Sequence, residues 1–147
     1  MASAPAAQSR LSRALAAYST ARSDALLSAR RELGVGELDA RALLFIVDNP
    51  GVRPTALRDY LGVTAAGVTT LVDRLIDRGV VRRDADENDR RSNHITATVD
   101  MTEEPWSALT RFDSALDEAI AARNDPQSDA LADLLTRLTE DANALQR

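Results

Sequence analysis

The stretch from Leu61 to Arg91 constrains the fold more than any other part of this sequence, because it joins a helical pattern to a strand pattern through a glycine. Apolar residues recur in it at spacings of three and four, which predicts a helix with one buried face: Val68, Leu71, Val72 and Leu75. Thr64 is suited to cap the start of this helix through its hydroxyl, and Gly79 is suited to end it.

Two short strand patterns follow this helix, with a polar loop between them. Val80 and Val81 begin the first strand, and the second, HITATV, has apolar residues at alternate positions: Ile95, Ala97 and Val99. The intervening segment, DADENDRRSN, contains no apolar side chain larger than alanine. A helix, a strand, a polar hairpin and a second strand form the second half of a winged helix. The sequence therefore predicts a mainly α fold with a small β-wing (α+β).

The residues before this stretch predict a second helix, so that the two helices are joined by a tight turn. Asp39 is a suitable cap for a helix over ARALLFIVDN, which Pro50 and Gly51 end. Val52 is expected to add a short strand to the sheet of the wing. Pro54 opens a short helix whose buried residues are predicted to be Leu57, Tyr60 and Leu61.

Longer helical patterns lie at both ends of the chain. Residues 9–33 keep an apolar stripe along a helix of roughly 20 residues, which needs a partner surface to bury it. Residues 102–105 predict a helix start, followed by apolar residues at helical spacing: Trp106, Leu109, Phe112, Leu116 and Ile120. Ser128 is suited to cap a last helix, which carries a near-heptad array: Leu131, Leu134, Leu135, Leu138, Ala142 and Leu145.

The run GVTTLVDRLIDRGVVRR, followed by D-x-x-D-R-R, resembles the core signature of the MarR (multiple antibiotic resistance regulator) family of winged helix-turn-helix transcriptional regulators. The resemblance extends from about Gly51 to Thr98. Directly after the wing the chain departs from the family pattern, because residues 97–101 read ATVDM in place of the usual L-T-x-x-G.

The resemblance implies a domain organisation and a function. Residues 1–147 are expected to form a single domain, in which residues 38–100 are the winged helix-turn-helix DNA-binding region. Residues 9–33 and 103–147 are implied to be dimerisation helices. The implied function is that of a transcriptional regulator, expected to be a repressor, that binds a pseudo-palindromic site in double-stranded DNA as a homodimer.

The helix after Thr64 is the candidate reading element, because a major groove admits one helix and residues near the start of that helix reach base edges. Methyl groups suit thymine, hydroxyls suit bases or phosphates, and an arginine suits guanine or a phosphate. The candidates are Thr64, Ala65, Ala66, Thr69, Thr70 and Arg74. The plainer alternative is that Thr69 and Thr70 are simply exposed polar residues. Asp73 and Arg78 are predicted to form structural ion pairs, and Asp77 to be solvated.

The polar loop is the candidate wing, and it carries Arg90 and Arg91. A planar guanidinium fits a narrow A·T-rich minor groove, where the negative potential is strongest. The family resemblance implies that Arg91 is the inserted side chain and that Asp89 positions the turn. The alternative is a solvated charged loop, which is the usual fate of such a run.

The formal net charge of −5 is unusual for a protein that binds nucleic acid. Residues 53–95, however, carry eight arginines and seven acids, or +1, so the remainder of the chain carries −6. Contacts with DNA must therefore be local, since steering by the field of the whole molecule is weak. The same net charge motivates an alternative function, a winged-helix protein-interaction module that does not bind DNA.

Members of the family respond to small phenolic or other aromatic anions, so the resemblance implies a small aromatic or anionic effector. Such a ligand would lie between the winged helix and the dimerisation helices, and would favour a spacing of the DNA-binding regions that does not match DNA. The candidate lining residues are Tyr18, Arg22, Phe45, Trp106 and Phe112. For each of them the alternative is a place in the hydrophobic core.

Other function classes find little support in the sequence. The chain has no cysteine, which excludes disulfides and thiolate metal sites, and His94 alone makes neither a zinc centre nor a catalytic triad. Residues 84–95 begin like a calcium loop but lack its glycine and its glutamate. We therefore expect no enzyme, no cofactor and no metal. Neither a signal peptide nor a bilayer-spanning segment is evident, so we expect a cytoplasmic protein.

Overall fold

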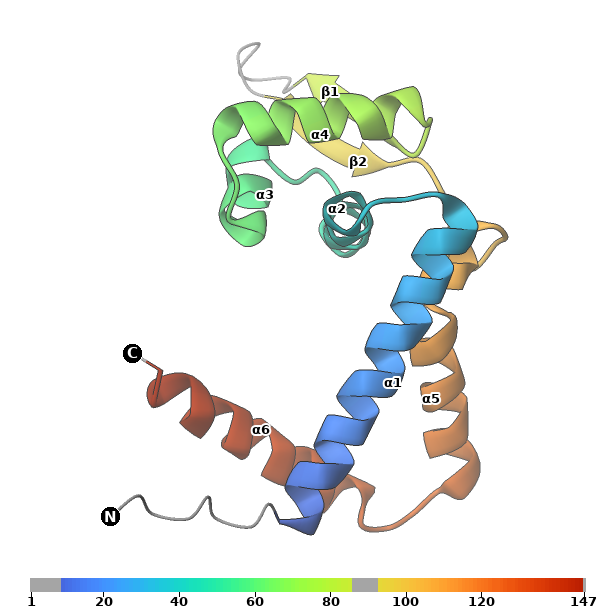
Figure 1. The fold of residues 1–147 in the computed structure, drawn as a ribbon, viewed down its shortest axis with the longest axis vertical. Coiled ribbons are helices and arrows are strands. Elements are labelled where there is room, and N and C mark those ends of the chain that lie inside the picture. The colour runs from blue at the N-terminus through green and yellow to red at the C-terminus, as the bar shows by residue number, and fades with distance from the viewer. Residues whose placement is uncertain (1–8, 86–92, 147) are drawn as a thin grey trace. The chain divides into compact units, whose positions relative to one another are not determined.

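The computed structural model describes residues 9–85 and 93–146, which divide into two compact units, one ending at Arg111 and the other beginning at Phe112. The first unit contains α1 (Arg10–Leu33), α2 (Glu37–Asp48), α3 (Pro54–Leu61), α4 (Ala65–Asp77), β1 (Val81–Ala85), β2 (Asn93–Ala97) and the 3-10 helix η1 (Trp106–Leu109). The second unit contains α5 (Arg111–Arg123), apart from its first residue, and α6 (Ser128–Ala144) (Figure 1).

These elements confirm the predicted fold class, a mainly α protein with a small antiparallel sheet. The segment from α2 to β2 is called the head below. None of the helices in the described parts of the chain combines the length and the apolar composition needed to cross a bilayer. That residues 1–147 act as a single domain stays a prediction.

Helix α1 begins and ends where the sequence predicts. The Ser9 hydroxyl accepts a hydrogen bond of 3.0 Å from the backbone N–H of Ser12, which satisfies a donor that the helix itself leaves unpaired. Gly34 ends the helix in the left-handed conformation, with φ of +63°, which glycine adopts without a steric penalty. Within α1, all of whose residues are described, Ala29 alone is buried. Most of its apolar stripe is therefore accessible in this single chain.

The helix-turn-helix is formed by α3 and α4, and local chemistry defines both ends of α4. The Thr64 hydroxyl accepts a hydrogen bond of 3.1 Å from the backbone N–H of Gly67, as its predicted capping role requires. Gly79 follows the last helical turn with φ of +72°, where a side chain would be strained. The glycine-terminated helix predicted from the sequence is thus confirmed.

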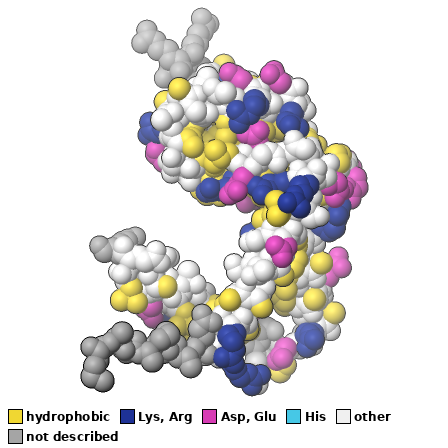
Figure 2. All heavy atoms as spheres, viewed as in Figure 1, with side chains coloured by type: hydrophobic (Ala, Val, Ile, Leu, Met, Phe, Trp, Pro, Cys, Tyr) yellow, Lys and Arg dark blue, Asp and Glu magenta, His cyan; other side chains and the backbone are white. Residues whose placement is uncertain are grey.

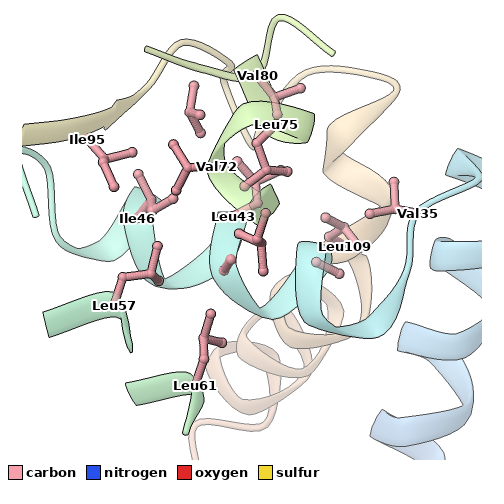
Figure 3. Packing of buried hydrophobic residues seen from close by; sticks show 14 of the residues in the cluster. Val35, Leu43, Ile46, Leu57, Leu61, Val72, Leu75, Val80, Ile95 and Leu109 are labelled. Carbon is pink, nitrogen blue, oxygen red and sulfur yellow. The ribbon is translucent and has the colours of Figure 1, made fainter. Parts of the chain in front are cut away.

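The hydrophobic core lies between these helices and the sheet. Its largest fully buried side chains come from α2, α3, α4 and the strand region: Leu43, Ile46, Leu57, Val72, Leu75, Val80 and Ile95. Figure 3 shows them converging, with Leu109 of η1 and Val35 farther along the same cluster. Burial of such a side chain contributes about 1.5–3 kcal/mol relative to exposure, so this cluster holds the reading helix on the head.

The two strands form an antiparallel hairpin whose register pairs Arg83 with Ile95 and Ala85 with Asn93. Val52 forms a bridge to β2. Its N–H donates to the carbonyl of Ile95 at 3.1 Å, and its carbonyl accepts from the N–H of Ile95 at 2.8 Å. The predicted extra strand is therefore present only as a single-residue bridge, beside a sheet of two strands. The bridge joins the start of α3 to the base of the hairpin.

Two predictions about the head are wrong. Asp39 does not cap α2, which begins earlier, at Glu37, after Gly36. Asp39 lies instead in the first turn of α2, is buried, and pairs with Arg74. Tyr60 is not buried, because 47% of it is exposed and its ring stacks on that of Phe45 at 4.0 Å between centroids. Only Leu57 and Leu61 of the three predicted residues point into the core.

The two predicted helix starts after the wing are also wrong. Residues 102–105 form a turn, in which the Asp100 carboxylate accepts from the backbone N–H of Thr102 at 2.8 Å, and the α-helix begins only at Arg111. Ser128 is the first residue of α6 rather than its cap. The preceding turn is closed by Asp125, whose carboxylate accepts from the backbone N–H of Gln127 at 2.8 Å.

The second unit has no buried residue in either helix, within the residues that the structure describes. Leu131, Leu134 and Leu138 of α6 lie at spacings of three and four, and each is at least 38% exposed. A helix with so accessible an apolar stripe is stable only when another surface covers it. Hydrophobic side chains are visible on this helix in Figure 2.

Candidate nucleic-acid interface

The face of α4 opposite the core is exposed and carries no charge over its first two turns. Ala65, Ala66, Thr69 and Thr70 are all exposed, whereas the four apolar residues of the predicted stripe are all buried. Positions separated by four residues lie on the same side of a helix, so these four side chains form a continuous surface. The structure therefore brings together four of the predicted reading residues, with Thr64 at the start of the helix.

The hydroxyl groups on this face are already engaged in hydrogen bonds. Thr69 donates its proton to the carbonyl of Ala65 at 3.1 Å, and Thr70 donates to the carbonyl of Ala66 at 3.1 Å. Each threonine thus presents a methyl group and an oxygen lone pair rather than a free donor. Thr64 differs, because its oxygen accepts from Gly67 and leaves its own proton available.

Arg74 lies on the next turn, and its guanidinium forms a two-point contact with the carboxylate of Asp39. The Nη2–Oδ1 distance is 2.5 Å and the Nε–Oδ2 distance is 3.2 Å. The Asp39 side chain is only 8% exposed, whereas that of Arg74 is 51% exposed. The hydrogen bond to Asp39, together with the carboxylate charge, raises the pKa of Arg74 above its ordinary value. The predicted contact of Arg74 with DNA stays a prediction.

The other charged residues around α4 are mostly paired. Asp73 accepts from Arg83 of β1 at 2.8 Å, which confirms its predicted ion pair. Arg78 donates to the backbone carbonyl of Gly34 at 2.7 Å, so the partner that the structure gives it is a carbonyl rather than the predicted acid. Figure 2 shows basic and acidic side chains interspersed over the visible face of the head. Because these charges are paired locally, they produce little net electrostatic potential around α4.

The base of the hairpin carries a further polar cluster. The Asp84 carboxylate accepts from Arg82 at 2.9 Å and from the Thr96 hydroxyl at 3.0 Å. The hydrogen bond from Arg82, followed by that from Thr96, holds the pKa of Asp84 below its ordinary value. The Nδ1 atom of His94 lies 2.8 Å from the carbonyl of Gly51. The predicted wing residues Asp89, Arg90 and Arg91 lie outside the described residues.

A pocket of about 580 Å³ opens in the first unit between α1, α2 and α3. Its lining residues are Arg22, Ser23, Leu26, Leu27, Arg30, Glu37, Ala40, Arg41, Leu44, Phe45, Asp48 and Tyr60. Two of the five predicted effector residues, Arg22 and Phe45, are among them. Tyr18 and Trp106 are not, and Phe112 belongs to the second unit.

Two further residues of this pocket, Arg41 and Tyr60, were not among the predicted effector residues, and they extend the ring of Phe45 into an aromatic surface with a charged end. The Tyr60 ring stacks on Phe45 with an interplanar angle of 13°, and the Arg41 guanidinium carbon lies 5.6 Å from the centre of the Tyr60 ring. Such a distance is typical of a cation–π contact. A signal was available in the sequence, because a tyrosine carries a polar hydroxyl that favours the boundary of a core over its interior.

The pocket is lined by three arginines and two acids. The Arg30 guanidinium contacts Glu37 at 3.2 Å, while the Nε atom of Arg30 is buried and has no hydrogen-bond partner in the described parts of the chain. No cluster of three metal-ligating side chains occurs among the same residues. The donor set therefore suits an anion with an aromatic or apolar body.

The fold and the exposed face of α4 define a winged helix-turn-helix protein. Residues 33–92 match the model of the MarR family. These residues include α2, the helix-turn-helix and β1, and the resemblance found in the sequence is confirmed over them. A search of curated proteins found no match.

Solved structures with the same fold cover nearly the whole chain. FabT of Streptococcus pneumoniae in complex with DNA has a TM-score of 0.61 and 20% identity, over 93% of this chain and 96% of that one. A MepR mutant of S. aureus bound to an oligodeoxyribonucleotide has a TM-score of 0.60 and 15% identity, over 94% and 99%. A transcriptional regulator of Thermotoga maritima has a TM-score of 0.59 and 23% identity, over 92% and 96%. At these identities the similarity establishes the fold.

Proposed function

We propose that the protein is a DNA-binding transcriptional regulator that places α4 in the major groove of a duplex. The exposed, uncharged face at the start of α4, opposite the core and next to the hairpin, is the observation that carries this proposal. A helix in this position of a winged helix-turn-helix reads base edges with the residues of its first turns. The DNA complexes of FabT and of the MepR mutant, which share this fold, are consistent with it.

The proposed contacts follow from the chemistry of each group. The free hydroxyl proton of Thr64, at the N-terminus of α4, suits a phosphate oxygen, because backbone donors and the helix dipole favour an anion there. Ala65, Ala66, Thr69 and Thr70 face the bases. Arg90 and Arg91 of the wing, positioned by Asp89, would enter the adjacent minor groove.

We propose a homodimer as the form that binds DNA. The accessible apolar stripes of α1 and α6 support it, because each needs a covering surface. Two reading helices related by a two-fold axis address half-sites about 10 bp apart, which predicts a pseudo-palindromic operator. Occupation of such a site near a promoter makes the protein a repressor. Binding of this kind requires no catalytic step, so we do not assign an enzymatic activity.

We propose that the pocket between α1, α2 and α3 binds a small aromatic anion that releases the DNA. Its stacked Phe45–Tyr60 pair and its arginine majority support this ligand class. Titration of benzoate into the protein–DNA complex tests it. Release that is lost in a Tyr60→Ala variant supports the site, and release that persists in that variant removes the pocket from the mechanism.

A mobility-shift assay against the DNA upstream of the protein's own coding region tests the main proposal. A complex at low salt is expected to weaken steeply as salt rises, because arginines displace counterions from phosphates. Arg91→Ala should weaken binding to every sequence and flatten the salt dependence, whereas Arg31→Ala, which removes an equal charge from α1, serves as the control. Unchanged affinity and salt slope in the Arg91→Ala variant would remove the wing from the mechanism.

The alternative, a winged-helix module that binds other proteins and no DNA, rests on the net charge of −5. The family match does not favour it. The same assay separates the two functions, because the absence of any shift at low salt is the outcome expected of an interaction module.

A further inference from the structure

The reading face of α4 has an unusual balance of hydrogen-bonding groups. Over its first two turns it offers four methyl-bearing side chains and no positive charge. The protons of Thr69 and Thr70 are donated to carbonyls of the same helix, so what these residues present outward is a methyl group and an acceptor oxygen. A face of this kind is apolar and accepts hydrogen bonds, but it does not donate them.

The major groove offers a matching pattern at one class of base pair. An A·T pair presents two acceptors, adenine N7 and thymine O4, together with the N6 donor and the thymine methyl group, whereas a G·C pair presents the acceptors N7 and O6 of guanine and the N4 donor of cytosine, with no methyl group. Both pairs therefore offer two acceptors and one donor, and the thymine methyl group is the feature that an apolar face can distinguish. Guanine is most often read by an arginine or lysine that donates to N7 and O6 together, and the first two turns of α4 carry neither residue. The same face pairs well with a methyl group and a donor.

Arg74 is the residue of α4 that could change this balance, and the structure holds it elsewhere. Its two-point contact with Asp39 uses the Nε and Nη2 donors, which form one edge of the fork with which an arginine reads guanine, and directs the side chain toward α2. Turning Arg74 toward DNA would leave the Asp39 carboxylate, 8% exposed, without this partner inside the head. Arg83 of β1 is likewise paired with Asp73 of α4.

We propose that α4 reads thymine methyl groups, so that A·T pairs occupy the base steps facing Ala65, Ala66, Thr69 and Thr70 in each half-site. Arg74 then acts as a positioning residue that holds α4 against α2 through Asp39. This inference rests on the proposed DNA-binding function and adds the class of base pair that the reading helix selects.

The first experiment changes the DNA and leaves the protein as it is. Sites are selected from a random duplex pool with the full-length protein, and each thymine of the bound half-site is then replaced by deoxyuridine, which lacks only the methyl group. Loss of one buried methyl contact should weaken binding about fourfold, which is the equivalent of roughly 0.8 kcal/mol. Deoxyuridine in flanking sequence outside the half-sites is the control and should have no effect.

The second experiment identifies the side chains that touch the methyl groups. Thr70→Ser and Thr69→Ser keep the hydroxyl but remove the methyl, so these variants should lose sensitivity to deoxyuridine at one step each. Thr70→Val and Thr69→Val keep the methyl group, so these variants should remain sensitive to deoxyuridine. Both threonines are exposed and lie outside the core, and thermal unfolding of each variant checks that the fold is kept.

The outcomes separate this inference from the proposal on which it depends. A selected site with A·T pairs at these steps, weakened by deoxyuridine in the threonine-containing protein but not in the serine variants, supports it. A site that is bound specifically but is insensitive to deoxyuridine, or one with guanine at these steps whose selection is lost in Arg74→Ala, overturns the inference and leaves DNA binding intact. Failure to select any duplex overturns both.

Discussion

The ion pair between Arg74 and Asp39 is the most informative single contact in the head, because it joins the reading helix to α2 across 35 positions of the chain. The arginine is half exposed, so water screens part of the attraction, while the carboxylate is almost fully buried. The main consequence of breaking the pair is therefore an uncompensated buried charge, rather than the loss of a strong attraction.

Arg74→Ala is accordingly expected to destabilise the protein more than the double variant Arg74→Ala, Asp39→Ala, in which the buried carboxylate is also removed. A double-mutant cycle in urea should give a coupling energy of about 1 kcal/mol for this pair. The exposed pair between Arg58 and Asp59, at 2.7 Å, is the matched control and should give a smaller coupling. Equal coupling energies in the two cycles would contradict the role assigned to burial.

Asp84 links stability to pH. Since Arg82 and Thr96 hold its pKa in the folded protein below the ordinary value of about 3.9, the unfolded chain binds a proton at a pH where the folded protein does not. The stabilising contribution is complete above that ordinary pKa and is lost as pH falls through the lower folded value. Asp84→Asn should therefore flatten the decline of the unfolding free energy below about pH 4. Thr96→Val should flatten it less, and parallel curves for wild type and Asp84→Asn would refute the assignment.

The sequence predicted which residues lie near the reading helix better than it predicted what they bind. Asp39 has a side chain and a sequence position that suit a helix cap. Its carboxylate pairs with Arg74 instead, and that contact depends on how α2 and α4 pack, which the local sequence does not reveal. Tyr60 fits the apolar stripe of α3, but its ring finds Phe45 at the surface rather than a place in the core. Both errors have the same cause, since each partner lies on another element.

At the scale of elements, α4 shows that local chemistry is enough to define where a helix begins, which face it buries and where it ends. Its cap, its apolar stripe and its terminal glycine all occur within 16 consecutive positions from Thr64 to Gly79, and the structure confirms each of them. The start of α5 was less predictable, because residues 102–105 have helix-start chemistry and are nevertheless held in a turn by Asp100. A local signal fails where an adjacent side chain satisfies the same backbone donor.

The cap of α4 gives a direct test at this scale. Thr64→Ala removes the acceptor for the Gly67 N–H and is expected to cost about 1 kcal/mol of unfolding free energy, because the donor is left without a protein partner. Thr64→Ser keeps the acceptor and should retain most of the stability. Urea unfolding measures both, and an equal loss in the two variants would show that the hydroxyl is not the stabilising group.

At the scale of the whole molecule, the accessible leucines of α6 are the feature that a single chain does not explain. Replacing Leu131, Leu134 and Leu138 with serine should convert the proposed dimer to monomers and sharply reduce operator affinity, since half-sites would be bound one at a time. Sedimentation measures the size, with circular dichroism as the check on helix content. A control set on the opposite side of the helix replaces Asp133, Thr136 and Glu140 with serine, and an unchanged size in the leucine variant would place the interface elsewhere.

The hydrogen bond from Arg78 to the carbonyl of Gly34 has a consequence for how such a dimer would respond to a ligand. Gly34 terminates α1 and Arg78 terminates α4, so the two helices share one junction. A small change in the tilt of a long helix about one of its ends moves the other end by a larger distance. If α1 is anchored by the opposite subunit, a modest change in its direction therefore alters the distance between the paired reading helices, with no rearrangement inside either head.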